Sequence, residues 1–157
     1  SASALESDAY AAHDQSIPDS FSGRMSFQRS VYRELSAPSQ LDPPLTGAAI
    51  LHVTVDVERA YHDPFLKWYA EIHVPAVLEA PGMLGARRFE NVELEAGEPL
   101  RAGQHAYCTI YEMEDASVIG RPEIVEAARK GACPADLEPH RIAVNHVYEE
   151  IFSAPYS

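Results

Sequence analysis

The chain has 157 residues, a length that suits one domain with an extension. Its hydrophobic fraction of 46% is enough for a core and excludes a chain that is disordered throughout. The formal net charge of −12 argues against nucleic acid and anionic membrane surfaces as partners, because both attract clustered Lys and Arg. No apolar run approaches the length of a membrane-spanning helix.

Cysteine usage and the N-terminal sequence indicate a cellular location. Cys108 and Cys133 are the two cysteines, and they form no CxxC spacing. Sparse thiols of this kind are typical of a reducing compartment. The first residues, SASALESDAY, lack the basic start and apolar segment of a signal peptide. We therefore predict a cytoplasmic protein.

Residues 1–47 differ in composition from the rest, being rich in Ser, Ala, Asp and Pro. Within them Phe27, Val31 and Leu35 are spaced by four, which predicts a short helix over about residues 26–35. Asp42-Pro43-Pro44 is typical of a linker. We interpret residues 1–47 as an arm, either mobile or packed over a pocket, and residues 48–157 as the folded domain.

The folded part opens with a strand and a helix. Residues 49–57, AILHVTVDV, alternate in a way that predicts a strand with one fully apolar face and His52 on the other. A helix follows from Asp63, as its cap, to Glu79, with Pro64 in the first turn. Pro75 predicts a kink, because it has no N–H to donate. The predicted apolar face of this helix consists of Phe65, Trp68, Tyr69, Ile72, His73 and Ala76.

The remaining elements complete a β-α-β-β-α-β order. Pro81-Gly82 ends the helix, and strands are predicted at about residues 84–94 and 104–113. A second helical region runs from Glu114 to Lys130 and breaks at residues 120–122; a last strand covers 140–152. This order predicts an α+β, ferredoxin-like fold with a four-stranded antiparallel sheet and helices on one face. Because all four strands carry apolar residues on both faces, we expect a homodimer through the open sheet face.

Several motifs within Ala48 to Phe152 resemble the dimeric α+β barrel superfamily, and its EthD-like proteins most closely. The matching residues are Trp68-Tyr69, His73-Val74-Pro75, Leu78, Pro81-Gly82, Ala86-Arg87-Arg88-Phe89 and the strand Tyr107 to Met113. The resemblance implies the same ferredoxin-like fold and a dimer. It is weak for function, since the superfamily holds cyclases, lactone isomerases, cofactor-free monooxygenases, haem-using enzymes and proteins without known activity.

Candidate catalytic residues are Tyr69 and His73, one helical turn apart, with His52 joining them if its strand face turns toward the helix. An imidazole moves protons near neutral pH, and a phenol donates a hydrogen bond to an oxygen that gains charge. The pair suits cyclisation, isomerisation or C–C lyase chemistry. The resemblance implies the same, because polyketide cyclases of the superfamily use a similar Tyr/His pairing. The alternative is that His73 bonds locally and Tyr69 only packs.

We predict a small cofactor-independent enzyme for a hydrophobic aromatic or polyketide-like carbonyl compound, with no metal site. Two alternatives are a haem-using or cofactor-free monooxygenase of the same superfamily and a non-catalytic small-molecule-binding protein. Arg87 and Arg88 either hold an acidic substrate group or pair with the surplus carboxylates. The candidate substrate-binding residues are Trp68, Phe65, Tyr107, Tyr111, His146 and Arg88.

Overall fold

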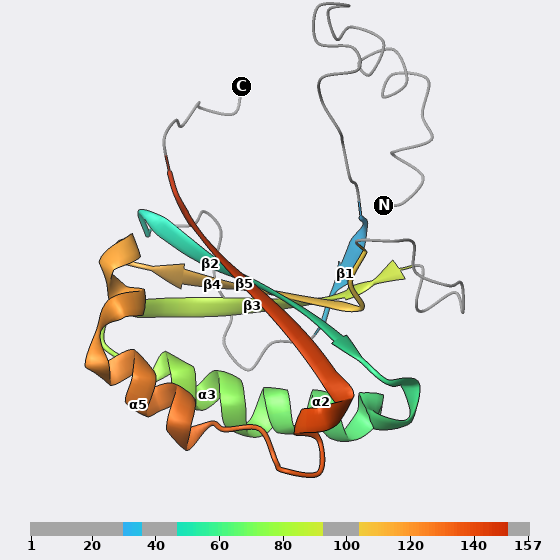
Figure 1. Ribbon diagram of the computed structural model, residues 1–157. Helices are drawn as coiled ribbons and strands as arrows, with labels where there is room; N and C mark the ends of the chain where they lie inside the picture. The colour runs from blue at the N-terminus through green and yellow to red at the C-terminus, as the bar shows by residue number, and fades with distance from the viewer. Residues whose placement is uncertain (1–29, 36–46, 93–103, 151–157) are drawn as a thin grey trace, which may run out of the picture.

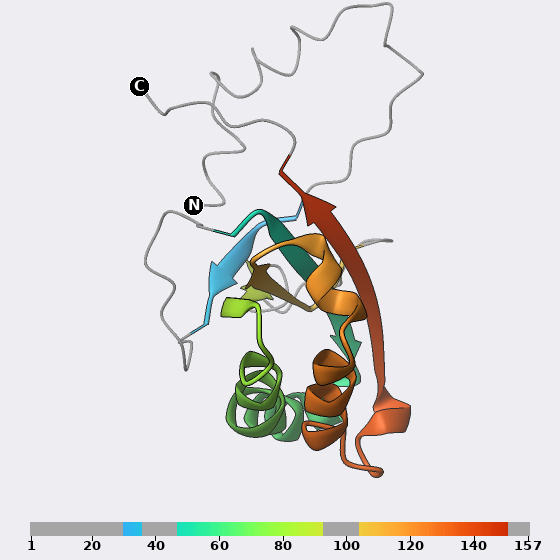
Figure 2. The ribbon, with the colours of Figure 1, turned by 90° about the vertical axis from the view of Figure 1, so that its left-hand side faces the viewer.

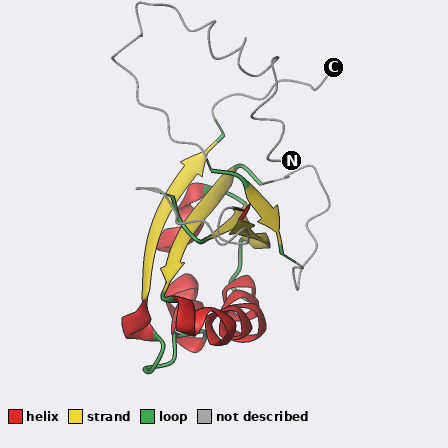
Figure 3. Ribbon diagram, turned by 90° about the vertical axis from the view of Figure 1, so that its right-hand side faces the viewer, coloured by secondary structure: helices red, strands yellow, loops and turns green. Residues whose placement is uncertain are grey.

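The computed structural model describes residues 30–35, 47–92 and 104–150 and shows an α+β fold (Figure 1). Helices gather on one side of a single antiparallel sheet, as Figures 1 and 3 show from two directions. The predicted fold class is confirmed. The predicted arm, apart from residues 30–35 and 47, lies outside the described residues, as does the loop at 95–103. The strands are β1 (Tyr32–Glu34), β2 (Ala49–Val57), β3 (Met83–Asn91), β4 (Tyr107–Met113) and β5 (Arg141–Glu149).

The strand order is β1-β3-β4-β2-β5, with every neighbouring pair antiparallel. Strands β2 to β5 and the helices between them have the ferredoxin-like connectivity that the sequence predicted. In Figure 2, β1 in blue and β5 in red lie at the two opposite edges. The predicted number of four strands is wrong, because β1 adds a fifth beside β3.

The helix predicted over residues 26–35 is wrong for its described part, which contains β1. Tyr32 pairs with Asn91 and Glu34 with Phe89, so the segment joins the open edge of β3. An isolated helix of ten residues is marginal in water, whereas an open strand edge offers backbone partners at once. Tertiary pairing therefore overrides the four-residue spacing.

A nearly continuous helical segment follows β2. It consists of the 3-10 turn η2 (Arg59–Tyr61), α2 (His62–Trp68), the π-helical turn η3 (Tyr69–His73) and α3 (Val74–Leu78). Asp63 lies in the first turn but makes no capping hydrogen bond, so the predicted cap is wrong. The kink predicted at Pro75 takes the form of the π turn, in which the Val74 N–H bonds the Tyr69 carbonyl five residues earlier. Pro75 has no N–H for the next α-helical bond, which favours this wider turn.

The π turn rotates the buried face of the helix. One extra residue shifts every later side chain by about 100° around the axis. Phe65 is buried before the turn, Tyr69 at its first residue, and Val74 and Val77 after it. Ile72, which the regular spacing placed on the apolar face, is 51% exposed. That part of the prediction is wrong because the spacing assumed an uninterrupted α-helix.

The second helical region has the predicted break. It consists of the 3-10 turn η4 (Ala116–Gly120), α5 (Pro122–Lys130) and, after a loop, η5 (Glu138–His140). Asp115 caps the start of η4, since its Oδ1 accepts a 2.8 Å hydrogen bond from the Ser117 N–H. Gly82, in the turn before β3, has a φ of 92°, and a Cβ there would lie 2.7 Å from Val118 Cγ2. Glycine is therefore required at this turn.

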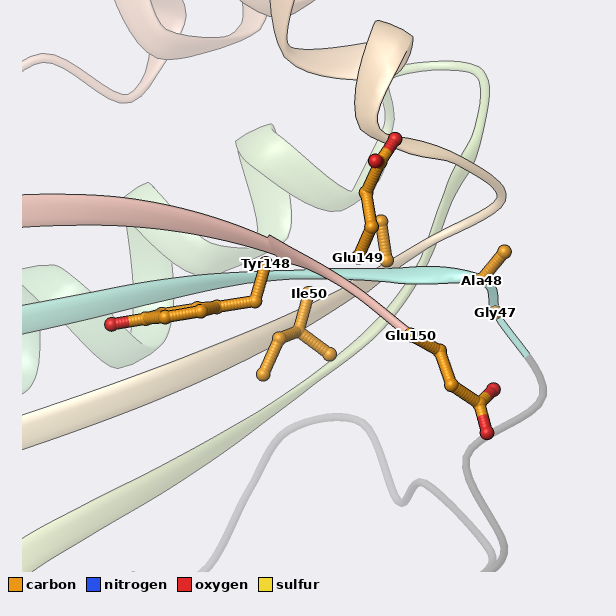
Figure 4. A pocket seen from close by; sticks show the side chains of 7 residues that line it. Gly47, Ala48, Ile50, Tyr148, Glu149 and Glu150 are labelled. Atoms are coloured by element: carbon orange, nitrogen blue, oxygen red, sulfur yellow. The ribbon is translucent and has the colours of Figure 1, made fainter. Parts of the chain in front are cut away.

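The two faces of the sheet have different environments. Leu51, Val53 and Val55 of β2 pack against the helices in the main core. Residues of the other parity point the opposite way, which we call the open face. Figure 4 shows Ile50 and Tyr148 of this face pointing away from the Glu149 side chain. On the open face of β5, Ile142 is 69% exposed and Tyr148 51%.

We predict that Gly131→Ala destabilises the fold by about 1–3 kcal/mol, the usual cost of overpacking. A Cβ at Gly131 would lie 3.0 Å from the His73 Cα and 3.1 Å from the Ala76 Cβ. Gly120→Ala is the matched control, because a Cβ there meets no atom within 4 Å. It should leave stability unchanged or raise it by up to about 1 kcal/mol. Urea unfolding measures both, and equal effects would contradict the close approach.

Candidate active site

A cavity of about 250 Å³ lies between the sheet and the helices. Its walls come from β2, β5, η3, α3, η4 and α5, with Met83 of β3 and Tyr111 of β4. Most of the lining is aliphatic. The polar and charged groups in it are Tyr69, His73, Tyr111, Arg141 and Asn145. An apolar cavity with a few convergent polar groups is the usual form of a small-molecule site.

His73 is held at the wall of this cavity by one hydrogen bond. Its Nδ1 lies 2.8 Å from the Gly131 carbonyl oxygen. A carbonyl oxygen only accepts, so Nδ1 carries the proton and donates it, and Nε2 keeps the lone pair of the neutral ring. The rings of Trp68 and Tyr69 lie 5.0 and 4.9 Å from the imidazole. The tautomer and position of His73 are therefore fixed by its surroundings.

Burial lowers the pKa of His73 below its ordinary value of 6.5. The hydrogen bond to Gly131 acts in the opposite direction, and the nearby Arg141 charge lowers the pKa further. The ring is therefore neutral at pH 7, with Nε2 able to accept a proton. This is the protonation state that a general base needs.

Two phenols lie on the same side of the sheet. The Tyr111 hydroxyl donates to the Tyr69 hydroxyl at 3.2 Å, and the Thr109 side chain also hydrogen-bonds Tyr69. Burial raises the pKa of Tyr69, and that of Tyr111 lies well above its ordinary value of 10. Both are therefore un-ionised. Because Tyr69 accepts from Tyr111, its own proton is left for another acceptor.

Two arginines flank the phenols in different settings. Arg88 is buried, with its guanidinium 5.3 Å from the centre of the Tyr69 ring. Arg141 lines the cavity, pairs with Glu138 at 2.6 Å and lies 5.6 Å from the centre of the Trp68 ring. Arg87, on the open face, makes two bonds of 3.0 and 2.6 Å to Glu34. For Arg87, the prediction of carboxylate pairing is the one the structure supports.

Not all predicted substrate-binding residues reach the cavity. Phe65, Arg88 and Tyr107 line a separate gap with no room for a water molecule, so they are core residues. Trp68 is buried and donates from Nε1 to the Ala132 carbonyl at 3.1 Å. Tyr111 does line the cavity. Burial in an apolar environment raises the pKa of Tyr107 to about 12.

His52 and His146 lie on the open face, on the other side of the sheet from His73. They are register partners across β2 and β5, and neither lines the cavity. The condition set for His52, that its face turns toward the helix, is not met. His146, a candidate substrate-binding residue, likewise faces away from the cavity. The alternation of a strand separates the two faces, but the sequence did not show which face the helices cover.

Sequence reasoning missed Arg141 and Asn145, which line the cavity from β5. Arg141 pairs with Val57 and Asn145 with Val53, so both belong to the helix-covered face. The same alternation that separates them from His146 was visible in the sequence. What was missing was the register of β5 against β2.

A second hollow, of about 220 Å³, lies where β2 begins and β5 ends (Figure 4). Glu149 and Glu150 supply its charged groups. Within the described ranges, no group of three or more His, Cys, Asp or Glu side chains is arranged to hold a metal ion. No helix in that part of the chain is long and apolar enough to cross a membrane.

Comparisons with known proteins leave the activity open. A family model described as a domain of unknown function, DUF4286, matches residues 48–121, from β2 to η4. No curated protein matches. One similar solved structure is the haem-degrader MhuD of Mycobacterium tuberculosis with two haems in its active site. It has 17% identity and a TM-score of 0.46, covering 68% of this chain and 99% of MhuD.

A second similar structure is SnoaB, a cofactor-independent oxygenase from Streptomyces nogalater. It has 13% identity and a TM-score of 0.43, covering 70% of this chain and all of SnoaB. These values are too low to transfer any residue role or activity. The class of protein is therefore defined by the structure itself, as a ferredoxin-like α+β protein with a cavity that contains a neutral imidazole and two phenols.

We predict that His73 makes the fold less stable in mild acid. The unfolded chain has an imidazole of ordinary pKa, 6.5, whereas the folded pKa is lower. Above the unfolded value both states are neutral; as pH falls below it, the unfolded state binds the proton first and stability is lost. Urea unfolding at about pH 7.5 and about pH 5.5 should show a smaller loss in His73→Gln than in the wild type. His52, also of lowered pKa, contributes equally in both proteins.

Proposed function

We propose that the protein is a small cofactor-independent enzyme that performs acid/base chemistry at a carbonyl group of a hydrophobic aromatic or polyketide-like compound. The observation that supports this most is that His73, Tyr69 and Tyr111 line one largely apolar cavity. Each group is held in a defined protonation state by burial or by a hydrogen bond. These are the parts needed to remove a proton beside a carbonyl and stabilise the resulting oxyanion.

In this proposal His73 is the general base. Its Nδ1–H stays on the Gly131 carbonyl while Nε2 takes a proton from the carbon next to the substrate carbonyl. The same nitrogen returns the proton at the end of the reaction. Positioned acid/base groups of this kind contribute about 10²–10⁴-fold to a rate.

Tyr69 is the proposed donor to the developing enolate oxygen. Tyr111 donates to the Tyr69 oxygen, so the Tyr69 proton is available to the substrate. The bond from Tyr111 also polarises the Tyr69 O–H and strengthens it as a donor. The un-ionised state required for donation follows from the raised pKa of both phenols.

Arg141 is the proposed anchor for an acidic group on the substrate. Among the residues that line the cavity it supplies the positive charge, and its pairing with Glu138 and stacking on Trp68 hold it in place. The volume lies just below the roughly 300–1,000 Å³ typical of small-molecule sites. A compact aromatic keto acid therefore fits better than an extended polyketide chain. Aldol cyclisation and isomerisation begin with the enolisation step described here, whereas C–C cleavage of the retro-aldol type releases the same enolate and needs the same stabilisation of its oxygen.

The haem-using alternative stays a prediction, although the size of this cavity favours a smaller ligand. Haem is larger than most small-molecule ligands, and the volume of about 250 Å³ is already small for those. The alternatives of a cofactor-free oxygenase and a non-catalytic binding protein stay predictions, as do the EthD-like relationship, the cytoplasmic location and a pocket-covering role for the arm.

The test uses 4-acetylbenzoate, which offers a carboxylate to Arg141, a carbonyl to Tyr69 and methyl protons to His73. Exchange of these protons in D₂O is followed by NMR. The wild type should accelerate exchange, His73→Gln should lose at least about 10²-fold of the acceleration, and Tyr69→Phe about 10²-fold or more. Arg141→Gln should weaken binding of 4-acetylbenzoate but not of its neutral methyl ester, measured as ligand-induced thermal stabilisation.

His105→Gln is the matched histidine control. His105 lies outside the cavity, with its Nδ1 2.8 Å from Asp56. The His105→Gln variant should exchange the methyl protons of 4-acetylbenzoate at the wild-type rate. Ligand stabilisation that is the same in the wild type, His73→Gln and Tyr69→Phe, with no exchange above the solvent rate, would reject the acid/base proposal in favour of simple binding.

We further propose that a second copy of the chain covers the open face of the sheet. Ile142 and Tyr148 are more than half exposed there, and Val144 is 37% exposed. Burial of such a patch by a second copy would be stabilised by about 25 cal/mol per Å² of apolar surface. A homodimer has the required self-complementary geometry, because the same face meets itself across a two-fold axis.

Light scattering after size-exclusion chromatography tests this arrangement. Ile142→Glu places a charge within the exposed patch and should convert a dimer to a monomer, because an unpaired charge resists burial. Val125→Glu is the matched control: Val125 is 66% exposed but lies on α5, away from the open face. The interface would be contradicted if both substitutions changed the measured molar mass equally, or if the wild type were a monomer.

A further inference from the structure

Two histidines stand side by side on the open face, outside the proposed active site. His52 of β2 and His146 of β5 are direct register partners. Directly opposite residues of an antiparallel pair have their Cβ atoms about 4.5–5.5 Å apart on the same side of the sheet. Both side chains are thus anchored by the backbone ladder and directed into the same space.

The two rings lie close enough for side-chain rotation to bring them onto one metal ion. Their centres are 6.4 Å apart and their planes differ by 32°. A metal ion bound at about 2.0–2.1 Å from a ring nitrogen lies about 3.2 Å from the ring centre, so two imidazoles on one ion have centres at most about 6.4 Å apart. That limit applies to ligands on opposite sides of the ion, whereas two imidazoles at a tetrahedral angle have centres about 5.2 Å apart. The observed separation therefore has to shorten by about 1 Å, which rotation of the exposed His146 side chain can supply.

The chemical environment leaves the ring nitrogens available. Within the described residues neither imidazole makes a hydrogen bond, and their contacts are with each other and with the Tyr148 ring, 6.2 Å from each. In the single chain His52 is partly exposed and His146 exposed, so an ion can reach them. The second copy proposed above would cover the same face and compete with the ion for this space. Partial burial, and then the neighbouring His146, lower the pKa of His52.

We propose that His52 and His146 form a two-imidazole site for one divalent transition-metal ion, such as Zn²⁺, Ni²⁺ or Cu²⁺, with water in the remaining positions. Imidazole nitrogens suit these ions, whereas Mg²⁺ and Ca²⁺ prefer oxygen ligands. The sequence indicated no metal site because the two histidines are 94 positions apart, as 146 − 52, and only strand pairing unites them.

A bound ion would join the edge strand β5 to its neighbour β2. Strand β5 pairs with β2 and with no other described strand. Its open-face side chains are exposed, so the ladder with β2 is what holds this part of the strand. An ion that binds the folded chain more tightly than the unfolded chain stabilises the fold in proportion to the logarithm of its concentration.

The test is isothermal titration of the untagged full chain, freed of metal by dialysis against EDTA, with Zn²⁺, Ni²⁺ and Cu²⁺. We expect one ion per chain, with Cu²⁺ bound most tightly in the Irving–Williams order. His52→Gln and His146→Gln should each weaken binding at least tenfold. His105→Gln is the control, since His105 is a nearby imidazole that is already paired with Asp56, and it should bind like the wild type.

Thermal melting with and without Ni²⁺ gives a second readout, because the wild type and His105→Gln should be stabilised and the two other variants should not. Circular dichroism of the metal-free variants checks that they are folded. Binding that persists in His52→Gln and His146→Gln, a stoichiometry of one ion per two chains, or no saturable binding would each overturn the proposal.

Discussion

The contact between the π turn and the end of α5 determines the geometry of the helix-covered half of the molecule. His73 donates to the Gly131 carbonyl, and Trp68 donates to the next carbonyl, that of Ala132. Gly131 has no side chain, which lets the two backbones approach to a distance that a Cβ would not permit. The same contact fixes the tautomer of His73 at the wall of the cavity. Packing and chemistry therefore depend on one interaction, and a change at Gly131 affects both.

The sheet separates two kinds of histidine chemistry. On the helix-covered face, His73 is held by one hydrogen bond and partly buried, so it has one nitrogen for proton transfer. On the open face of the single chain, His52 and His146 face the same space, and no described residue hydrogen-bonds their ring nitrogens. Burial lowers the pKa of both His73 and His52. The neighbour of His73 is the Gly131 carbonyl, whereas the neighbour of His52 is the imidazole of His146. The neighbours determine which chemistry each imidazole can perform.

The proposed active site was partly predictable from local spacing. Tyr69 and His73 are four positions apart in one helical segment, so their proximity follows from helical geometry alone. Tyr111 and Arg141 come from strands far away in the sequence, and the pairing of β2 with β4 and β5 brings them to the cavity. Phe65 and Tyr107 looked equally suitable as binding residues but are core residues. Aromatic composition does not separate a cavity wall from a core, since both are apolar surfaces.

The sequence by itself determined the order of elements, the break at Gly120-Arg121-Pro122, the turn at Pro81-Gly82 and the two-faced alternation of β2. Each of these rests on local chemistry: the missing N–H of proline, the free φ of glycine and the two-residue period of a strand. Only the tertiary structure decided that residues 32–34 pair as a fifth strand, that the helix widens before Pro75 and that His52 faces away from His73. Those outcomes depend on register and on which face the helices cover, and both are set by contacts between residues distant in the chain.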